Sequence, residues 1–149
     1  MRKKRVLLDP GHGGKDPGAV FGSRLEKKDT LLLAEQVAKE LEERGVTVRL
    51  TRTADSYCSL AERVRIAEEL KADAFVSLHR NAFHDSAAGG TELWVHPQTK
   101  EESIPLAKTI LSQLEQVGIQ QNRGVKTGTY QMLAGSMPSV LLELGFITN

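Results

Sequence analysis

Two histidines, His12 and His79, and two glutamates, Glu26 and Glu143, stand at places in this sequence where they could bind a metal ion or use it in catalysis. His12 lies in the glycine- and proline-rich stretch LLDPGHGGKDPGA at residues 7–19, and His79 follows the apolar run AFVSL. Glu143 stands inside the apolar run SVLLELGF, where an unpaired carboxylate would be costly to bury. Two imidazoles and a carboxylate are a frequent ligand set for catalytic zinc, which keeps one position open for water. These residue types suit metal-assisted hydrolysis, provided that the fold brings them together.

Short β-rich runs alternate with longer amphipathic segments along the chain. The β-rich runs predict strands at Arg5–Asp9, Val46–Thr51, Ala74–Leu78, Thr91–Val95 and Ser139–Glu143. Helical spacing of apolar residues predicts helices at Glu26–Arg44, Ser59–Leu70 and Ile104–Val117. Ser59 is a favourable N-cap, and Gly45 and Gly118 follow their helices as stop signals. This order is typical of a single α/β domain with a twisted, mostly parallel mixed sheet that helices flank on both faces.

The segments between these elements are expected to be irregular where they are longest, at Pro10–Leu25, Arg80–Gly90 and Asn122–Gly128. In a parallel sheet, ligands bind beyond the carboxyl ends of the strands. His12, His79 and Glu143 would therefore share one edge of the sheet if their strands run parallel. Taken singly, each could be structural, because a histidine can simply hydrogen-bond locally and Glu143 could form an ion pair or face solvent at an edge.

Glu26 is a candidate for the third metal ligand, because it begins the first predicted helix just after the His12 loop. An acidic residue in the first turn of a helix more often serves only the helix dipole. The position of Glu26 therefore leaves both roles open.

Length and composition limit the possible classes of protein. A chain of 149 residues suits one domain, and a net charge of +1 gives no argument for a nucleic-acid or membrane partner. The single cysteine, Cys58, excludes an intrachain disulfide and a Cys-rich zinc site, and without an adjacent base it is expected to be an inert thiol. The apolar run after MRKKR is too short for a signal peptide, and no run of about 18 apolar residues could span a membrane.

The glycine loop matches neither common phosphate-binding pattern. A P-loop needs Ser or Thr after its lysine, but Lys15 is followed by Asp16. A dinucleotide fingerprint needs a third glycine three residues after Gly13, where this chain again has Asp16. We expect the glycines instead to turn the backbone sharply off the first strand so that His12 faces a metal.

Four collinear stretches resemble a known family. LLDPGHGGKDPGA, LEKKDTLLLAEQVAKEL, VSLHRNA and MPSVLLELGFITN are similar, in this order and over nearly the whole chain, to the motifs of the zinc-dependent N-acetylmuramoyl-L-alanine amidases, the AmiC-like cell-wall hydrolases of the Amidase_3 family. The resemblance implies that His12, Glu26 and His79 bind Zn²⁺ and that Glu143 is the catalytic glutamate.

The resemblance also implies a reaction and a setting. The expected reaction is zinc-dependent hydrolysis of the amide between the lactyl group of N-acetylmuramic acid and L-alanine of the peptidoglycan stem peptide. The chain would be an amidase catalytic domain over residues 1–149, without the closing C-terminal helix that the family usually has. We expect a monomer that acts on the cell wall outside the cytoplasm, as an autolysin, a sporulation enzyme or a phage lysin, with no nucleic-acid or membrane partner.

The chain departs from the family after His79, where Arg80 stands in place of the usual small residue. Arg80 and the neighbouring Asn81 are therefore expected to contact the substrate, with the arginine meeting stem-peptide carboxylates. Two alternatives stay open: a zinc peptidase of the carboxypeptidase type, and a non-catalytic peptidoglycan-binding module on the same fold.

Overall fold

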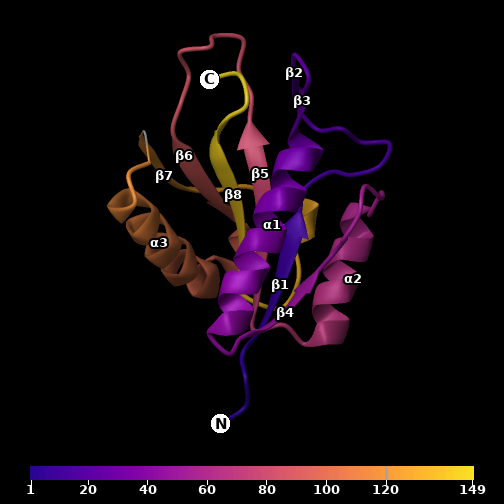
Figure 1. The fold of residues 1–149 in the computed structure, drawn as a ribbon. Coiled ribbons are helices and arrows are strands. Elements are labelled where there is room, and N and C mark those ends of the chain that lie inside the picture. The colour runs from indigo at the N-terminus through magenta and orange to yellow at the C-terminus, as the bar shows by residue number, and fades with distance from the viewer. Residues whose placement is uncertain (120) are drawn as a thin grey trace.

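The centre of the molecule is a six-stranded sheet with the strand order β4-β1-β5-β8-β6-β7 (Figure 1). The computed structural model describes residues 1–119 and 121–149. The strands of this sheet are β1 (Arg5–Pro10), β4 (Thr47–Leu50), β5 (Ala74–Asn81), β6 (Thr91–Val95), β7 (Asn122–Thr127) and β8 (Ser139–Phe146). A separate two-stranded hairpin consists of β2 (Val20–Phe21) and β3 (Arg24–Leu25). The helices are α1 (Glu26–Glu43), α2 (Leu60–Leu70) and α3 (Lys100–Gln116), with short 3₁₀ turns η1 (Pro97–Thr99) and η2 (Gln131–Leu133).

Four adjacent strands run in the same direction. β1 pairs in parallel with β4 and β5, and β5 pairs in parallel with β8. β6 is antiparallel to β8, and β7 is parallel to β6. The predicted mostly parallel mixed sheet is confirmed, and the carboxyl ends of β1, β5 and β8 meet at one edge.

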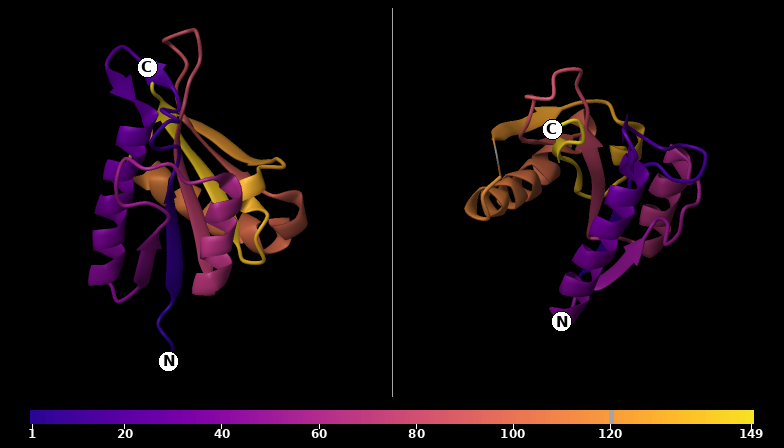
Figure 2. Two further views of the ribbon diagram at one scale, coloured as in Figure 1. Left: turned by 90° about the vertical axis from the view of Figure 1, so that its right-hand side faces the viewer. Right: turned by 45° about the horizontal axis from the view of Figure 1, so that its top comes forward.

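Helices cover both faces of the sheet, as predicted. On one face, α2 and η2 pack on a cluster that includes Leu7, Phe75 and Leu141. On the other face, α1 and α3 pack on a cluster that includes Leu78, Val140 and Leu142. The side view in Figure 2 shows α1 and α2 on opposite sides of the strands. Because side chains alternate along a strand, residues at odd numbers in β1, in β5 and in β8 up to Glu143 face α2; beyond Glu143 the β5–β8 register shifts.

The predicted ends of the helices are largely confirmed. Ser59 caps α2, since its hydroxyl accepts a hydrogen bond from the Glu62 amide at 3.1 Å. Gly45 and Gly118 follow α1 and α3 with positive φ angles of 84° and 91°, which glycine adopts readily. α3 begins at Lys100, four residues earlier than predicted.

Two predictions about irregular segments were wrong. Asn122–Gly128 was expected to be a loop, but residues 122–127 form β7, whose polar sequence NRGVKT lacks the apolar alternation that predicts a strand. β5 was expected to end at Leu78 but continues to Asn81, so His79 lies inside the strand. The hairpin of β2 and β3 lies within the other long segment, Pro10–Leu25.

A buried ion pair joins β1 to α2. Asp9 is 0% exposed and Arg63 is 3% exposed, and Arg63 Nη1 lies 2.5 Å from Asp9 Oδ1. The same guanidinium donates to the carbonyl oxygens of Pro10, His12 and Cys58 at 2.9–3.0 Å. The pair therefore fixes the point at which the chain leaves β1.

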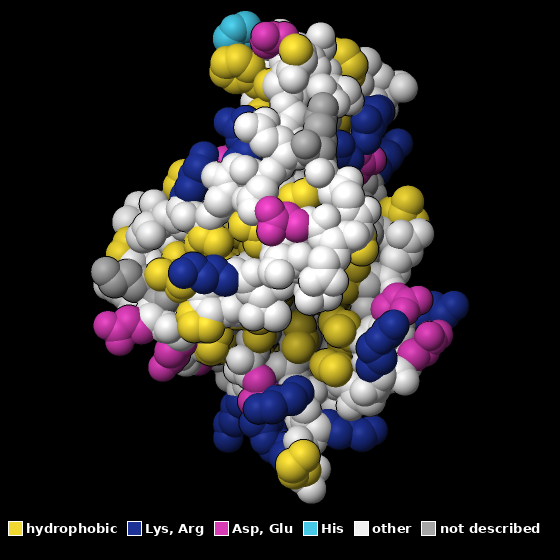
Figure 3. All heavy atoms as spheres, turned by 90° about the vertical axis from the view of Figure 1, so that its left-hand side faces the viewer, with side chains coloured by type: hydrophobic (Ala, Val, Ile, Leu, Met, Phe, Trp, Pro, Cys, Tyr) yellow, Lys and Arg dark blue, Asp and Glu magenta, His cyan; other side chains and the backbone are white. Residues whose placement is uncertain are grey.

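The outer surface carries charges of both signs, in keeping with the small net charge. Figure 3 views the side on which α3 and β7 lie, and Lys and Arg side chains gather there at the end of the molecule that holds the N-terminus. Within residues 1–119 and 121–149, no helix is both long enough and apolar enough to cross a membrane.

Replacing Arg63 by methionine should destabilise the protein strongly. The substitution leaves the buried Asp9 carboxylate without its cation, and breaking one side of a buried pair typically costs about 3–5 kcal/mol. Arg65→Met is the matched control, because Arg65 lies on the exposed side of the same helix and pairs there with Glu62 and Glu69. Urea unfolding of both variants measures the difference. Equal losses of stability would contradict a dominant role for the Asp9–Arg63 pair.

Candidate metal centre

Three side chains from separate parts of the fold converge on one point. His12 Nε2 lies 3.1 Å from Glu26 Oε1 and 3.2 Å from His79 Nδ1. His79 Nδ1 lies 3.1 Å from the same Glu26 oxygen. Zinc at its usual ligand distances holds tetrahedral ligand atoms about 3.3 Å apart. The arrangement therefore fits one small cation with little movement of the side chains.

His12 occupies a backbone conformation that few residues other than glycine adopt. Its φ angle is +65°, in the left-handed region, where strain is often retained for function. The surrounding loop holds it there, because Gly13 and Asp16 form a β-bridge and Arg63 binds the His12 carbonyl. His12 Nδ1 lies 2.8 Å from Asp16 Oδ2, so the ring donates from Nδ1 and turns Nε2 toward the other ligands.

Glu26 is buried at the first position of α1, with an exposed fraction of 3%. Its Oε2 accepts from the Ala19 amide at 2.8 Å, and its Oε1 accepts from the Arg80 amide at 2.9 Å. Burial alone would raise the pKa of Glu26, but the adjacent rings of His12 and His79 and the hydrogen bonds from these two amides hold it well below its usual range. Glu26 therefore stays ionised and faces the histidines, which the helix dipole alone would not require.

The charge of this cluster favours a cation. Burial alone would lower the pKa of His12, but the carboxylates of Glu26 and Asp16 raise it above its ordinary value. A positive charge, whether a proton or a metal ion, is therefore favoured among the three converging atoms.

Two glycines allow the loop to lie directly against the ligands. A Cβ atom on Gly11 would lie 2.4–2.7 Å from ring atoms of His79. A Cβ atom on Gly18, which has a φ angle of +66°, would lie 2.6 Å from both Glu26 Oε2 and His12 Cδ2. The loop needs glycine for close approach as well as for turning.

Glu143 lies beside this cluster. It is the register partner of His79 in the β5–β8 ladder, and both side chains line the same cavity of about 460 Å³. Within the part of the chain that the structure describes, no group hydrogen-bonds to its buried Oε2 atom. Burial, reinforced by the negative charges of Glu26 and Glu92, raises the pKa of Glu143 to about 8. Glu143 is therefore a carboxyl group that can both hold and release a proton near neutral pH.

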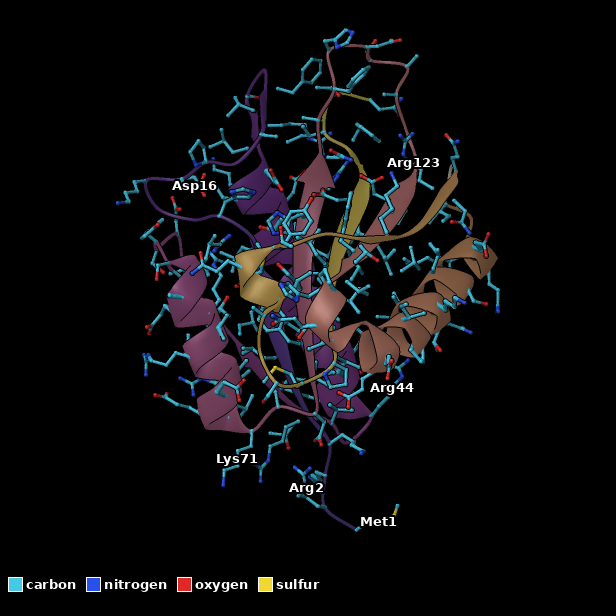
Figure 4. The ribbon with its side chains drawn as sticks, turned by 180° about the vertical axis from the view of Figure 1, so that it is seen from behind. Met1, Arg2, Asp16, Arg44, Lys71 and Arg123 are labelled. Carbon is cyan, nitrogen blue, oxygen red and sulfur yellow. The ribbon has the colours of Figure 1, made fainter. Side chains whose placement is uncertain are left out.

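The cavity opens on the face of the sheet covered by α2 and η2. Its walls include the partly exposed Tyr57 and Leu60 before and at the start of α2, and Tyr130 and Met132 at η2. Figure 4, turned by 180° from Figure 1, brings this face toward the viewer, with Asp16 on the loop at one side of the upper edge of the sheet and Arg123 at the other. A cavity lined by both polar and apolar side chains suits a ligand that carries both kinds of group.

Comparison with known proteins decides the family. A family model described as N-acetylmuramoyl-L-alanine amidase matches residues 6–149. The chain belongs to the Amidase_3 family. This confirms the family that the four sequence motifs predicted.

Individual amidases are similar to the chain in sequence and in structure. The N-acetylmuramoyl-L-alanine amidase from Clostridium difficile 630 is 34% identical with a TM-score of 0.94, and the match covers 100% of this chain and 83% of that one. AmiC2 of Nostoc punctiforme is 39% identical with a TM-score of 0.90, covering 97% and 81%. The probable cell wall amidase LytH of Staphylococcus aureus is 40% identical over 154 residues, which span 100% of this chain and 50% of LytH. The chain thus spans about half the length of the curated relatives that it matches.

The two residues that follow His79 in this Amidase_3 chain point their polar groups at protein partners. Arg80 Nη1 lies 3.2 Å from Asp29 Oδ2, and Arg80 Nη2 donates to the Phe146 carbonyl at 3.4 Å. Asn81 Nδ2 donates to Glu92 Oε1 at 2.8 Å. Arg80 contributes its backbone amide to the centre through Glu26, while a substrate contact by either side chain stays a prediction.

Sequence reasoning missed three polar residues that lie next to the histidines or behind them: Asp9, Ser77 and Asp16. Asp9 and Ser77 are polar residues at alternate, inward positions of the apolar runs VLLD and AFVSL, which is a signal that could have been used. Asp16 lies four residues after His12 in a loop, and its spacing gives no comparable signal. Burial raises the pKa of the Cys58 thiol, which fits the prediction that this thiol is inert.

Replacing Glu143 by glutamine should stabilise the metal-free protein in a pH-dependent way. Because the folded pKa of about 8 is above the ordinary value of 4.5, ionising Glu143 costs stability as the pH rises between these values. The gain in unfolding free energy of Glu143→Gln should be near zero in acid, grow through this range and level off above it. Urea unfolding after chelator treatment, repeated across pH, measures the gain.

Glu40→Gln is the matched control for that series. Arg44 lowers the pKa of Glu40 on the exposed side of α1, so ionised Glu40 adds stability. Glu40→Gln should therefore lower the free energy of unfolding as the pH rises, the opposite of the effect of Glu143→Gln. A gain for Glu143→Gln that does not change with pH would contradict the raised pKa.

Proposed function

We propose that this chain hydrolyses the amide between the lactyl carbonyl of N-acetylmuramic acid and L-alanine of the peptidoglycan stem peptide. The observation that carries the proposal is the convergence of His12 Nε2, Glu26 Oε1 and His79 Nδ1 within 3.2 Å of one another, beside the Glu143 carboxyl group. Family membership supplies the substrate class, since the matched model is that of N-acetylmuramoyl-L-alanine amidases.

Zn²⁺ is the proposed cofactor, with His12, Glu26 and His79 as its ligands. Two neutral imidazoles and one carboxylate leave an open coordination position, as catalytic zinc sites do. Zinc bound there would polarise the scissile carbonyl and make a water acidic enough to lose a proton near neutral pH.

Glu143 is the proposed general base and then the general acid. Its carboxylate accepts a proton from the attacking water while the new C–O bond forms. The same group returns that proton to the nitrogen of L-alanine as the C–N bond breaks. The pKa of Glu143 is raised to about 8 in the metal-free protein, and a bound Zn²⁺ would lower it toward the range in which the group can bind and release one proton in each turnover.

The remaining functional assignments follow from this reaction. Residues 1–149 are the proposed amidase catalytic domain, peptidoglycan is its macromolecular partner, and the reaction takes place on the cell wall outside the cytoplasm. The carboxypeptidase-like alternative would use the same ligand types, but the family match favours cleavage at the sugar–peptide junction.

Digestion of purified peptidoglycan tests the reaction. Mass analysis should find stem peptides with a free L-alanine amino group and glycan with free lactyl carboxylates. A zinc chelator should abolish the products, and added Zn²⁺ should restore them. Release of a C-terminal amino acid would instead identify a carboxypeptidase, and chelator-resistant cleavage would contradict the zinc assignment.

Glu143→Ala should separate catalysis from metal binding. Loss of the general base should lower the rate about 10²- to 10⁴-fold, while zinc content stays near one ion per chain, because Glu143 is outside the proposed ligand set. Metal analysis of the purified variant, beside the peptidoglycan assay, measures both quantities. Glu40→Ala on α1 is the surface control. Near wild-type activity of Glu143→Ala would show that another group carries the proton.

A further inference from the structure

Behind His79, a chain of buried polar groups leads away from the metal centre toward the core. His79 Nε2 lies 3.1 Å from Ser77 Oγ, and Ser77 Oγ lies 2.6 Å from Asp9 Oδ2. The other oxygen of Asp9 accepts from Thr51 Oγ1 at 2.7 Å and is paired with Arg63. Asp9, Arg63 and His79 also line the cavity, but none of these contacts involves Glu143.

We propose that Ser77 and Asp9 are positioning residues that fix His79 as its Nε2–H tautomer and so direct the Nδ1 lone pair at the metal. The proposal rests on the proposed function, because it concerns the same centre. Neither residue touches the substrate or the reacting atoms.

The direction of each hydrogen bond in this chain follows from its chemistry. A carboxylate only accepts, so the single hydroxyl proton of Ser77 is donated to Asp9. Ser77 Oγ can then only accept from the histidine ring, which places the proton of the neutral imidazole on Nε2. The Nδ1 atom is left with its lone pair toward Glu26 and His12, as a metal ligand requires.

Packing prevents the ring from adopting another arrangement. Asp9 and Ser77 are 0% exposed and His79 is 8% exposed, so water cannot readily replace their hydrogen bonds. The Gly11 backbone lies against the ring, where even a Cβ atom would come within 2.4 Å of Cε1. His12 differs, because its orienting carboxylate, Asp16, is partly exposed on the loop. The hydrogen-bond chain from His79 through Ser77 to Asp9, here called the relay, is therefore buried and rigid, whereas the partner of His12 lies at the surface.

Zinc affinity of two matched variants tests the relay. Ser77→Ala removes the acceptor for Nε2–H, and loss of such a partner typically lowers metal affinity about 10- to 100-fold. Thr51→Val also removes one hydroxyl bound to Asp9 but leaves the bond between Ser77 and His79, so its affinity should stay near that of the wild type. Competition with a chromophoric chelator gives the dissociation constants, and thermal unfolding shows whether both variants are folded.

The histidine tautomer supplies a readout that a merely structural role would not change. In the metal-free protein at mildly alkaline pH, ¹⁵N–¹H correlation of the imidazole groups should show His79 with its proton on Nε2. In Asp9→Asn the new amide can donate to Ser77, which lets the hydroxyl donate to Nε2 and moves the ring proton to Nδ1. Zinc affinity should fall together with that change.

Three results would overturn the proposal: a wild-type Nδ1–H tautomer, equal zinc affinities for Ser77→Ala and Thr51→Val, or losses of affinity that follow only the loss of thermal stability. If the wild type itself does not bind zinc, the proposed function fails. The tautomer measurement, which needs no metal, then decides by itself whether Ser77 and Asp9 position His79. Failure of this proposal and failure of the proposed function are therefore distinguishable.

Discussion

The buried ion pair between Asp9 and Arg63 is the constraint on which the centre depends. Two charges without exposure to water are tolerated only when every polar atom has a partner, and here hydroxyls and backbone carbonyls supply them. Those partners come from β1, from Thr51 directly after β4, from β5 and from the loop that carries His12. Satisfying one ion pair therefore fixes the relative positions of the segments that present both histidines.

The alternation of side chains along the strands explains why the centre forms on the α2 face. Leu7 and Phe75 are core residues on that face, and Asp9 and His79 lie further along the same strands on the same side. Glu143 follows Leu141 in β8 in the same way. The inward positions thus change from apolar to polar toward the carboxyl ends, so a core and a polar site share one continuous face.

Much of this could be predicted from the sequence because the signals are local. The apolar runs identified five strands of the main sheet, and the polar residues at their ends identified His12, His79 and Glu143 as neighbours. Glu26 could not be assigned from its position, because its role depends on amides of Ala19 and Arg80 that only the tertiary structure brings to it. Its position only made Glu26 a candidate, and the family resemblance was needed to predict it as a metal ligand.

Other features lacked a local signal. β7 pairs with β6 at the end of the sheet, and pairing there needs backbone hydrogen bonds but few apolar side chains. The reversed direction of β6 also follows from its neighbours in space, which hydrophobic periodicity does not report. The side chain of Arg80 alternates away from that of its neighbour His79 and meets Asp29 of α1, a contact that adjacency in sequence does not predict.

The negative charge around the centre links the three converging atoms of His12, Glu26 and His79 to the carboxyl group of Glu143. Glu26 is ionised, and Glu92, held by Asn81 and Lys126, adds a second charge near Glu143. Both charges make Glu143 retain its proton when no metal is present. A divalent cation among the three converging atoms would oppose these charges and lower the pKa of Glu143, since nearby positive charge favours a carboxylate. In the proposed reaction the carboxyl group would thus become a competent base when the metal is bound, and the proposed metal binding and general-base catalysis would be coupled through charge rather than through direct contact.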